Sequence, residues 1–465
     1  MTTRATAGLT LALGLLIARG PAPAAARVRV GLPHRISLTS PIGPPCTTGD
    51  PNFLRGHVVE TDIAVSPRTP RRVLVSWIQD GAATDTVMTS RDGGQTFSRI
   101  LVPGLSACTG GGADAASDPG VAFSADGRTA YFSGVGVKFL SLQPFKPSVT
   151  MFASRLGDGG FSWRNPFAVQ PGAGMYWDKP ILSTDPRRPR VAYYAFDLRR
   201  PPAYNSGYSL FARTTNAGRS WSRPRKLYDP HASSSWPGNS ETLVNRDRSL
   251  LNVFVLTSGE GGSGPATIMA ARSVDGGRHW RRPVVIGRAS GFPPSDPLSQ
   301  NIVETDGAFP SQTVAPNGDV YVAWAAPGPT RRRSRVVVAR SKTGGRTWRS
   351  AAVRVRGQSL FPAVAVSGDG TVGVLHYVVG AASRRGVWPA RVAVDTTRRF
   401  GHWRSHRVAG PFNTLTAVDI VRGCCAIGDY VNMARLPHGL IAAYPMAKPV
   451  SRHQTDVYVS RIGTR

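Results

Sequence analysis

Short apolar segments alternate with turn residues along almost the whole chain. Each unit has an apolar segment, a tight turn and a second apolar segment, as in Asp62-Ile-Ala-Val-Ser-Pro67 and Val73-Leu-Val-Ser-Trp77. Seven such pairs occur, and turns such as Ala315-Pro-Asn-Gly-Asp319 suit tight β connections. Because no long helical periodicity appears, the pattern predicts seven β-hairpins in an all-β protein.

A second pattern, of about eight residues, recurs between these hairpins. Its copies share a Ser or Thr, a polar residue that is often Asp, one or two glycines and a final aromatic residue. They occupy 90–97, 154–163, 214–221, 273–280 and 341–348, and a decayed copy ends at Trp403. The spacing is about that of a four-stranded propeller blade. We expect each copy to join the third and fourth strands of a blade, with its glycines at positive φ and its aromatic residue packed between sheets.

The number of hairpins sets the expected architecture. Seven hairpins, each extended by two outer strands, predict a seven-bladed β-propeller that occupies residues 27–465 as one domain. The last unit ends at Asp456-Val-Tyr-Val-Ser460 without a fourth strand. We expect the segment from Val28 to Leu38 to supply it, because closing the ring removes the exposed edges of an open sheet.

The N-terminal residues follow a different pattern. Arg4 precedes an apolar run from Ala7 to Ile17, and Ala24-Ala25-Ala26 follows. This is the layout of a secretory signal peptide, which we place at residues 1–26, and its apolar run is too short to span a bilayer. We therefore expect a secreted, extracellular protein with no membrane span.

The chain is strongly basic. It has 57 Lys and Arg residues against 27 Asp and Glu residues, a formal net charge of +30 over 465 residues. Such a charge attracts polyanions whatever the fold, although genomic codon bias toward arginine is an alternative origin that stays open. No basic strand interleaved with aromatic residues appears, so we expect a glycan or anionic polysaccharide as partner, no nucleic acid, and a monomer.

Acidic residues gather at one expected face of the ring. The starts of the innermost strands lie on the face opposite the eight-residue loops. Glycoside cleavage needs one carboxyl group as acid and another as base or nucleophile. Two alternatives stay open, namely a structural calcium ion and hydrogen bonding to backbone N–H groups of neighbouring blades. The carboxylates at or near these starts are Glu60, Asp62, Asp118, Asp178, Glu241, Asp306 and Asp429, of which we predict Glu60, Asp62, Asp178, Glu241 and Asp429 to be catalytic.

Aromatic and arginine residues accompany these carboxylates. Aromatic rings stack on sugar faces, and guanidinium groups bind carboxylate or sulfate in a bidentate way. Core packing and solvated surface charge are the respective alternatives. The predicted substrate-binding residues are Tyr176, Trp177, Tyr430, Arg199, Arg200 and Arg332.

The chain has four cysteines. Cys46 and Cys108 fall in loops that enter the innermost strands of adjacent blades, so we predict a disulfide bond between them in an oxidising compartment. Four cysteines allow three pairings, and a cross-pairing with Cys424 or Cys425 stays open. No zinc-type spacing, phosphate loop or Gly-Xaa-Ser-Xaa-Gly motif appears, so we expect no metal in the site and no cofactor beyond the possible calcium.

The recurring motif, with Gly238-Asn-Ser-Glu241 and Ile427-Gly-Asp-Tyr430, resembles the Asp-box (bacterial neuraminidase repeat) β-propellers of the sialidase-like superfamily. The resemblance covers nearly all of residues 27–465 and implies a glycoside hydrolase of exo-sialidase type or a glycan-binding protein. The alternative function is a non-catalytic adhesin or interaction scaffold. Sialidases have six blades, an arginine triad and an Arg-Ile-Pro signature, so a six-bladed ring is the alternative fold. The nearest string, Pro33-His-Arg-Ile-Ser37, lacks the final proline, so we transfer no catalytic residue from that family.

Overall fold

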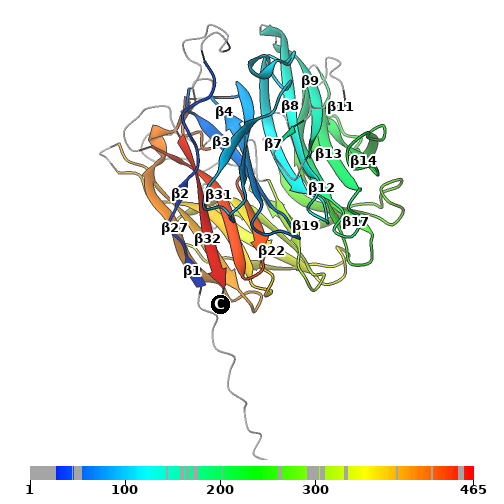
Figure 1. Ribbon diagram of the computed structural model, residues 1–465. Helices are drawn as coiled ribbons and strands as arrows, with labels where there is room; N and C mark the ends of the chain where they lie inside the picture. The colour runs from blue at the N-terminus through cyan, green and yellow to red at the C-terminus, as the bar shows by residue number, and fades with distance from the viewer. Residues whose placement is uncertain are drawn as a thin grey trace, which may run out of the picture.

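The computed structural model describes residues 28–43, 46, 55–142, 145–157, 162–163, 167–170, 176–201, 203–259, 264–290, 303, 309–328, 334–383, 386–419, 423–448 and 455–464. These residues form an all-β propeller of seven antiparallel blades (Figure 1). The seven-bladed prediction is therefore confirmed and the six-bladed alternative is wrong. Within these ranges, no helix is long and apolar enough to cross a membrane.

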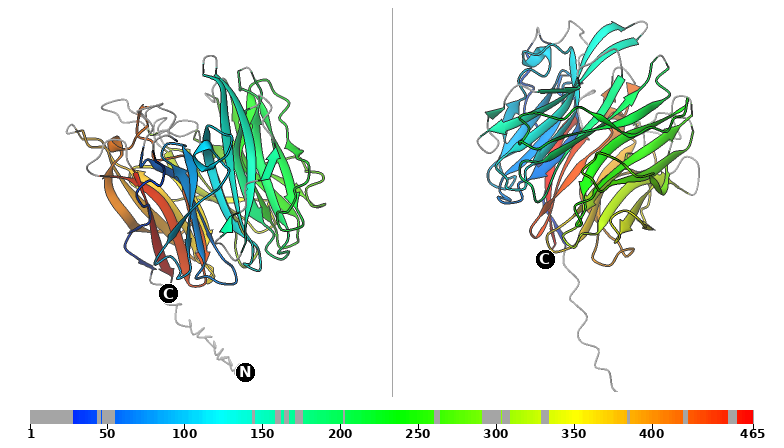
Figure 2. Two further views of the ribbon diagram at one scale, coloured as in Figure 1. Left: turned by 45° about the horizontal axis from the view of Figure 1, so that its top comes forward. Right: turned by 90° about the vertical axis from the view of Figure 1, so that its right-hand side faces the viewer.

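The seven innermost strands surround the centre of the molecule. They are β3 (Val58–Val65), β7 (Ala115–Phe123), β12 (Tyr176–Thr184), β16 (Ser235–Val244), β20 (Ser311–Val314), β24 (Gln358–Val366) and β30 (Asn432–Leu436). Each contacts the innermost strand of the next blade, and β30 contacts β3, so the ring is closed. The first and last blades lie side by side, blue against red (Figures 1 and 2).

Each blade continues outward through three further strands. The second strands are β4 (Val73–Gln79), β8 (Ala130–Leu142), β13 (Ala192–Arg199), β17 (Leu250–Ser258), β21 (Val320–Pro327), β25 (Val372–Val379) and β31 (Gly439–Ala447). The third strands are β5 (Thr84–Ser90), β9 (Phe145–Gly157), β14 (Gly207–Thr214), β18 (Ala266–Ser273), β22 (Ser334–Ser341), β26 (Pro389–Thr397) and β32 (Thr455–Thr464). The outer strands of blades 1 to 6 are β6 (Ser98–Leu101), β10 (Ser162–Trp163) with β11 (Phe167–Gln170), β15 (Arg225–Tyr228), β19 (Val284–Ala289), β23 (Arg349–Ala352) and β27 (Arg404–Asn413).

The seventh blade takes its outer strand from the N-terminal end of the described chain. β1 (Val28–Val30) pairs antiparallel with β32, with Val28 opposite Thr464 and Val30 opposite Ile462. β2 (His34–Arg35) pairs with the same strand. Strands from the two ends of the chain thus complete one sheet and hold the ring closed.

Apolar side chains fill the space between neighbouring blades. Every residue of β4 and of β25 is buried, because a second strand is covered by blades on both sides. A strand that is buried on both faces has a nearly continuous apolar sequence, as both of these strands do. The large rings of Trp77, Trp324 and Tyr194 lie in these layers.

The loop at residues 90–97 shows what the recurring motif does. Asp92 Oδ1 accepts hydrogen bonds from Ser90 Oγ (2.8 Å) and from the backbone N–H of Thr96 (3.0 Å). The N–H of Gly94 donates to Ser90 Oγ (2.8 Å), and Gly93 and Gly94 have φ values of 83° and 88°. Asp275 and Ser273 make the same bonds in blade 4. The motif fixes the turn between the third and fourth strands, and in the copy at 154–163 residues 158–161 lie outside the described ranges.

The predicted Cys46–Cys108 disulfide bond is present. It joins two loops that are 62 residues apart in sequence. Cys425 is also disulfide-bonded, but the side chain of Cys424 lies outside the described residues.

Candidate active site in the central channel

Bulges interrupt five of the innermost strands near their starts. In β3, β7, β12, β16 and β24, two residues oppose one residue of the second strand. The first residue of each bulge has positive φ, a conformation that costs a non-glycine residue about 1–3 kcal/mol and clusters at functional sites. These residues are Glu60 (58°), Asp118 (56°), Lys179 (46°), Asn239 (53°) and Phe361 (50°).

Lys179 lies at the centre of a buried charge cluster. Its Nζ is 2.6 Å from Asp118 Oδ1, 3.3 Å from Glu60 Oε2 and 3.5 Å from Asp429 Oδ2. The Lys179 side chain is 5% exposed, and its Nζ lies 4.7 Å from the centre of the Tyr430 ring. Burial alone would lower the pKa of Lys179, but Asp118, Glu60 and Asp429 reverse the effect and raise this pKa well above its usual range. We call these four charged residues the Lys179 cluster.

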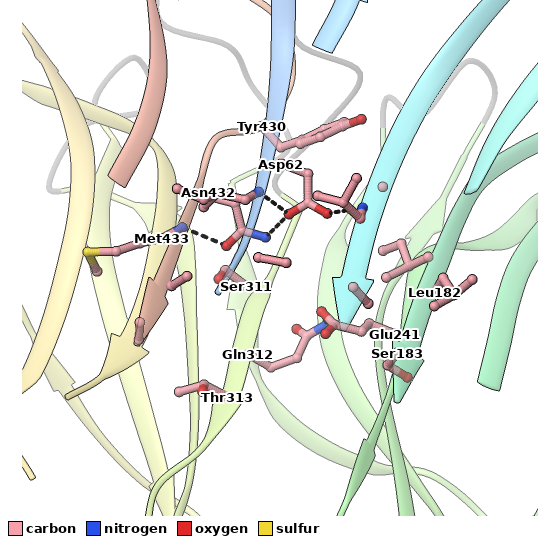
Figure 3. A pocket seen from close by; sticks show the side chains of 18 of the residues that line it. Asp62, Leu182, Ser183, Glu241, Ser311, Gln312, Thr313, Tyr430, Asn432 and Met433 are labelled. Carbon is pink, nitrogen blue, oxygen red and sulfur yellow. Dashed lines mark hydrogen bonds between the residues drawn. The ribbon is translucent and has the colours of Figure 1, made fainter. Parts of the chain in front are cut away.

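A second layer of polar side chains lies two residues further along the strands. Asp62 accepts hydrogen bonds from Asn432 Nδ2 (2.6 Å) and from two backbone N–H groups, including that of Val121 in the next blade (2.7 Å). Glu241 Oε2 accepts one from Gln312 Nε2 (2.5 Å). Figure 3 shows Asp62, Glu241 and Gln312 around one cavity, below Tyr430.

The carboxyl groups of Asp62 and Glu241 differ in how readily they ionise. Burial raises the pKa of Glu241 to about 8, and the negative charge of Asp62 adds to this. Burial also raises the pKa of Asp62, but the hydrogen bonds from Val121 and Asn432 oppose that rise. More donors stabilise the ionised form of Asp62, so it is the better suited of the two to carry the negative charge, whereas Glu241 stays protonated at pH 7.

A cavity of about 640 Å³ runs along the centre of the ring and is lined by residues of all seven innermost strands. Its volume lies within the ~300–1,000 Å³ range of ligand sites. Besides Asp62 and Glu241, its wall contains Gln312, whose buried Oε1 has no hydrogen-bond partner among the described residues. Arg435 also lines the cavity, and its guanidinium donates to the carbonyl groups of Val366 and Val314. The cavity wall therefore carries a protonated carboxyl group (Glu241), a carboxylate (Asp62), a hydrogen-bond acceptor without a partner among the described residues (Gln312 Oε1) and a guanidinium group (Arg435).

Four of the predicted site residues belong to the cavity wall. Asp62, Glu241, Asp429 and Tyr430 line it, and Glu60 is connected to them through Lys179. An open acidic mouth was expected, but Glu60, Asp429 and Asp178 are buried. Glu60 and Asp429 are buried with Asp118 around Lys179, which supplies the compensating positive charge, whereas Asp178 pairs with Arg199.

Other predicted residues lie away from the cavity wall. Asp178 Oδ2 is 3.6 Å from Arg199, whose guanidinium stacks on Tyr176 and Trp236 at 5.7 and 4.9 Å. Arg200 pairs with Asp229 at 2.9 Å within blade 3. The Trp177 side chain, Arg332 and Asp306 lie outside the described residues.

The part of the chain that the structure describes contains no group of three or more His, Cys, Asp and Glu residues able to hold a metal ion. The three carboxylates of the Lys179 cluster surround an ammonium group, which takes the place that a calcium ion would need.

Three residues that the sequence did not single out are important here. Lys179 occupies the same bulge position as Glu60 and Asp118, so alignment of the repeats on the bulges would have found it. Gln312 and Asn432 carry no titratable group, and nothing in their local sequence distinguishes them from other strand residues.

Comparisons with known proteins add little to this description. No family model and no curated protein matches the chain. Among solved structures it is similar to an α-L-arabinofuranosidase from Fusarium graminearum, with 13% identity, a TM-score of 0.49 and coverage of 93% of this chain and 98% of that chain. It is also similar to a Hadza microbial sialidase, with 12% identity, a TM-score of 0.48 and coverage of 86% of this chain and 74% of that chain. At these values the likeness carries no argument about activity, and the fold assignment rests on the seven blades themselves.

Proposed function

We propose that this protein is a secreted glycoside hydrolase of the Asp-box, sialidase-like type, with Glu241 as general acid and Asp62 as base or nucleophile. The observation that carries the proposal is the pair of carboxyl groups in one cavity, of which one has a pKa of about 8 and the other accepts three hydrogen bonds. Two carboxyl groups whose surroundings separate their pKa values can divide acid and base work at neutral pH.

The chemistry follows from these protonation states. Glu241 would give its proton to the oxygen of the leaving sugar as the glycosidic C–O bond breaks. Asp62 would take a proton from the attacking water or bond to the anomeric carbon itself, and either route consumes one water per bond cleaved. The three donors on Asp62 stabilise its ionised form and so oppose the effect of burial on its pKa.

The cavity wall supports a hydroxyl-bearing and acidic substrate. Gln312 Oε1, which has no hydrogen-bond partner among the described residues, can accept a hydrogen bond from a sugar hydroxyl. Arg435 has no carboxylate partner among the described residues and suits the carboxylate or sulfate of an acidic sugar. Export is supported by the signal-like N-terminus and by the Cys46–Cys108 bond, which is typical of oxidising compartments.

Hydrolysis of a panel of glycosides, with release of reducing sugar as the readout, tests the proposal. Asp62→Asn and Glu241→Gln should each lower kcat/KM on the order of 100-fold or more. Asp126→Asn, the same change at the turn between β7 and β8 of blade 2, is the control and should leave kcat/KM unchanged. Cleavage that survives both cavity substitutions would contradict the assignment.

A binding-only propeller is the second candidate. It is favoured by the backbone N–H of Val121, which binds Asp62 from the next blade, since such a bond also serves to tie neighbouring blades together. In that case the panel would show glycan binding without hydrolysis, and Asp62→Asn would lower the free energy of unfolding.

A further inference from the structure

A second cleft lies between blades 5 and 6, at the loops that join their third and fourth strands. It has a volume of about 680 Å³, and its walls are formed by residues within 340–349 and 398–402. Phe400 packs on Tyr321 of β21, with ring centres 6.1 Å apart, so the blade 6 loop is held against blade 5. The cleft is separate from the central cavity, because the two share no lining residue.

The recurring motif has lost its acidic residue in these two loops. The third position of the motif is Asp92 in blade 1 and Asp275 in blade 4, but Asn216 in blade 3, Thr343 in blade 5 and Arg399 in blade 6. The formal charge at this position is therefore −1 in blades 1 and 4, zero in blades 3 and 5, and +1 in blade 6. The cleft forms where the two neighbouring loops both lack the aspartate.

The blade 5 loop keeps its shape without the carboxylate. Thr343 Oγ1 accepts a hydrogen bond from the backbone N–H of Thr347 (2.9 Å). In blade 1, Asp92 Oδ1 accepts the equivalent bond from the N–H of Thr96 (3.0 Å). Ser341 Oγ accepts the N–H of Gly345 at 2.9 Å, like the equivalent bond in blade 1. The aspartate is therefore dispensable for the turn, and its absence changes mainly the charge.

The cleft is strongly positive. Its walls hold five cations, Arg340, Lys342, Arg349, Arg398 and Arg399. Among the described residues two carboxylates compensate them, because Asp319 pairs with Arg340 and Asp369 pairs with Arg398, which leaves 5 − 2 = +3. Lys342, Arg349 and Arg399 are exposed and have no carboxylate partner among the described residues. Like charges at close range repel, so an anion would be stabilised between them.

We propose that this cleft binds an acidic polysaccharide through its sulfate or carboxylate groups. Guanidinium groups bind both oxyanions with two parallel hydrogen bonds, and the half-buried Trp348 and Phe400 add ring surface on which sugars stack. The volume suits a short stretch of a single chain rather than a broad duplex. The inference does not rest on the proposed function, since it uses no residue of the central cavity.

The sharpest variant restores the missing aspartate. Thr343→Asp recreates the hydrogen-bonding set of Asp92 and Asp275, so the loop should fold, and it adds one negative charge to the cleft. Asn216→Asp makes the same restoration in blade 3, away from the cleft, and changes the net charge equally. Thr343→Asp should weaken binding of dextran sulfate and polygalacturonate about tenfold and lower the slope of log K against log salt by about one, whereas Asn216→Asp should change neither.

A paired neutralisation provides a second test. Arg349→Gln with Arg399→Gln should lower both affinities further and reduce the salt slope by about two. Arg219→Gln with Arg223→Gln, two exposed arginines of the blade 3 loop, removes the same charge elsewhere and is the matched control. The variants Asp62→Asn and Glu241→Gln should bind both polymers like the wild type, which keeps this test distinct from that of the hydrolase.

Several outcomes would overturn the proposal. If cleft and control variants weaken binding equally, attraction comes from the overall charge and not from the cleft. If neutral dextran binds as well as the acidic polymers, the cations are not the binding groups. If double-stranded DNA binds more tightly than both polysaccharides at about 0.15 M salt, the partner class is wrong. Comparison of dextran sulfate with polygalacturonate identifies which oxyanion the cleft prefers.

Discussion

Replacement of Lys179 by Met is the strongest perturbation that the structure defines. It removes the only ammonium group within 4.0 Å of Glu60, Asp118 and Asp429 among the described residues and leaves three carboxylates buried together. Breaking one buried ion pair by removing one partner costs about 3–5 kcal/mol. Since three partners are left here, we expect a loss at the upper end of that range at pH 7.

The matched control is Lys226→Met. Lys226 pairs with Asp229 at 2.9 Å, but its side chain is 57% exposed, so the loss should be at most about 1 kcal/mol. Urea unfolding of both variants, followed by tryptophan fluorescence, measures the difference. A loss for Lys179→Met no larger than that for Lys226→Met would refute the reasoning.

The pH dependence of the same measurement isolates the cause. The pKa of Lys179 is raised, so its stabilisation is fully present below the ordinary lysine value of about 10.4 and does not change between pH 5 and 7. In Lys179→Met, the carboxylates that have lost this ammonium partner repel one another, and uptake of protons relieves the repulsion as the pH falls. The deficit relative to wild type should therefore shrink from pH 7 to pH 5, and a constant deficit would mean that lost packing, not charge, is responsible.

Three further predictions concern other parts of the fold. Gly277→Ala should lower the free energy of unfolding by about 3 kcal/mol, because φ is +85° and the new Cβ would lie 2.2 Å from the Phe211 ring. Gly370→Ala has a similar φ of +84° but no atom within 4 Å of the new Cβ, so it should cost only about 1 kcal/mol. Equal losses in urea unfolding would contradict this. Cys108→Ser should lower the free energy of unfolding by about 4 kcal/mol, the chain-entropy value for a loop of 62 residues, and an unchanged stability in urea unfolding would contradict this. Glu241→Gln should become more stable relative to the wild type as the pH rises from 5 to 8. The raised pKa of Glu241 gives the wild type a stability that is fully present below a pH of about 4.5 and is lost as the pH rises through about 8. A difference that does not change with pH would show that Glu241 titrates normally.

The blades could be predicted because their pattern is local. Each second strand is a short apolar segment. Each eight-residue loop needs glycines at positive φ and a polar residue for its turn. Both features can therefore be recognised directly in the sequence. The position of the N-terminal strand followed from a count of strands, because a ring must close.

The site could be predicted only in part. Asp62 and Glu241 stood out as carboxylates in apolar strands, but the bulges that turn Lys179 and Asp118 toward the channel depend on backbone pairing that no residue pattern records. The lysine that allows Glu60, Asp118 and Asp429 to be buried has no counterpart in the pattern of carboxylates along the chain. The pKa of Glu241 likewise depends on burial by seven blades, which the sequence does not specify.

The pH profile of kcat/KM on a cleaved glycoside tests the central claim most directly. If Glu241 is the general acid, the rate must fall as this group ionises, with an apparent pKa near 8 on the alkaline side. Glu241→Gln should lose this limb together with most of the activity, while Asp126→Asn should keep both. An alkaline limb near pH 8 that persists in Glu241→Gln, or the absence of any hydrolysis by the wild type, would contradict the account.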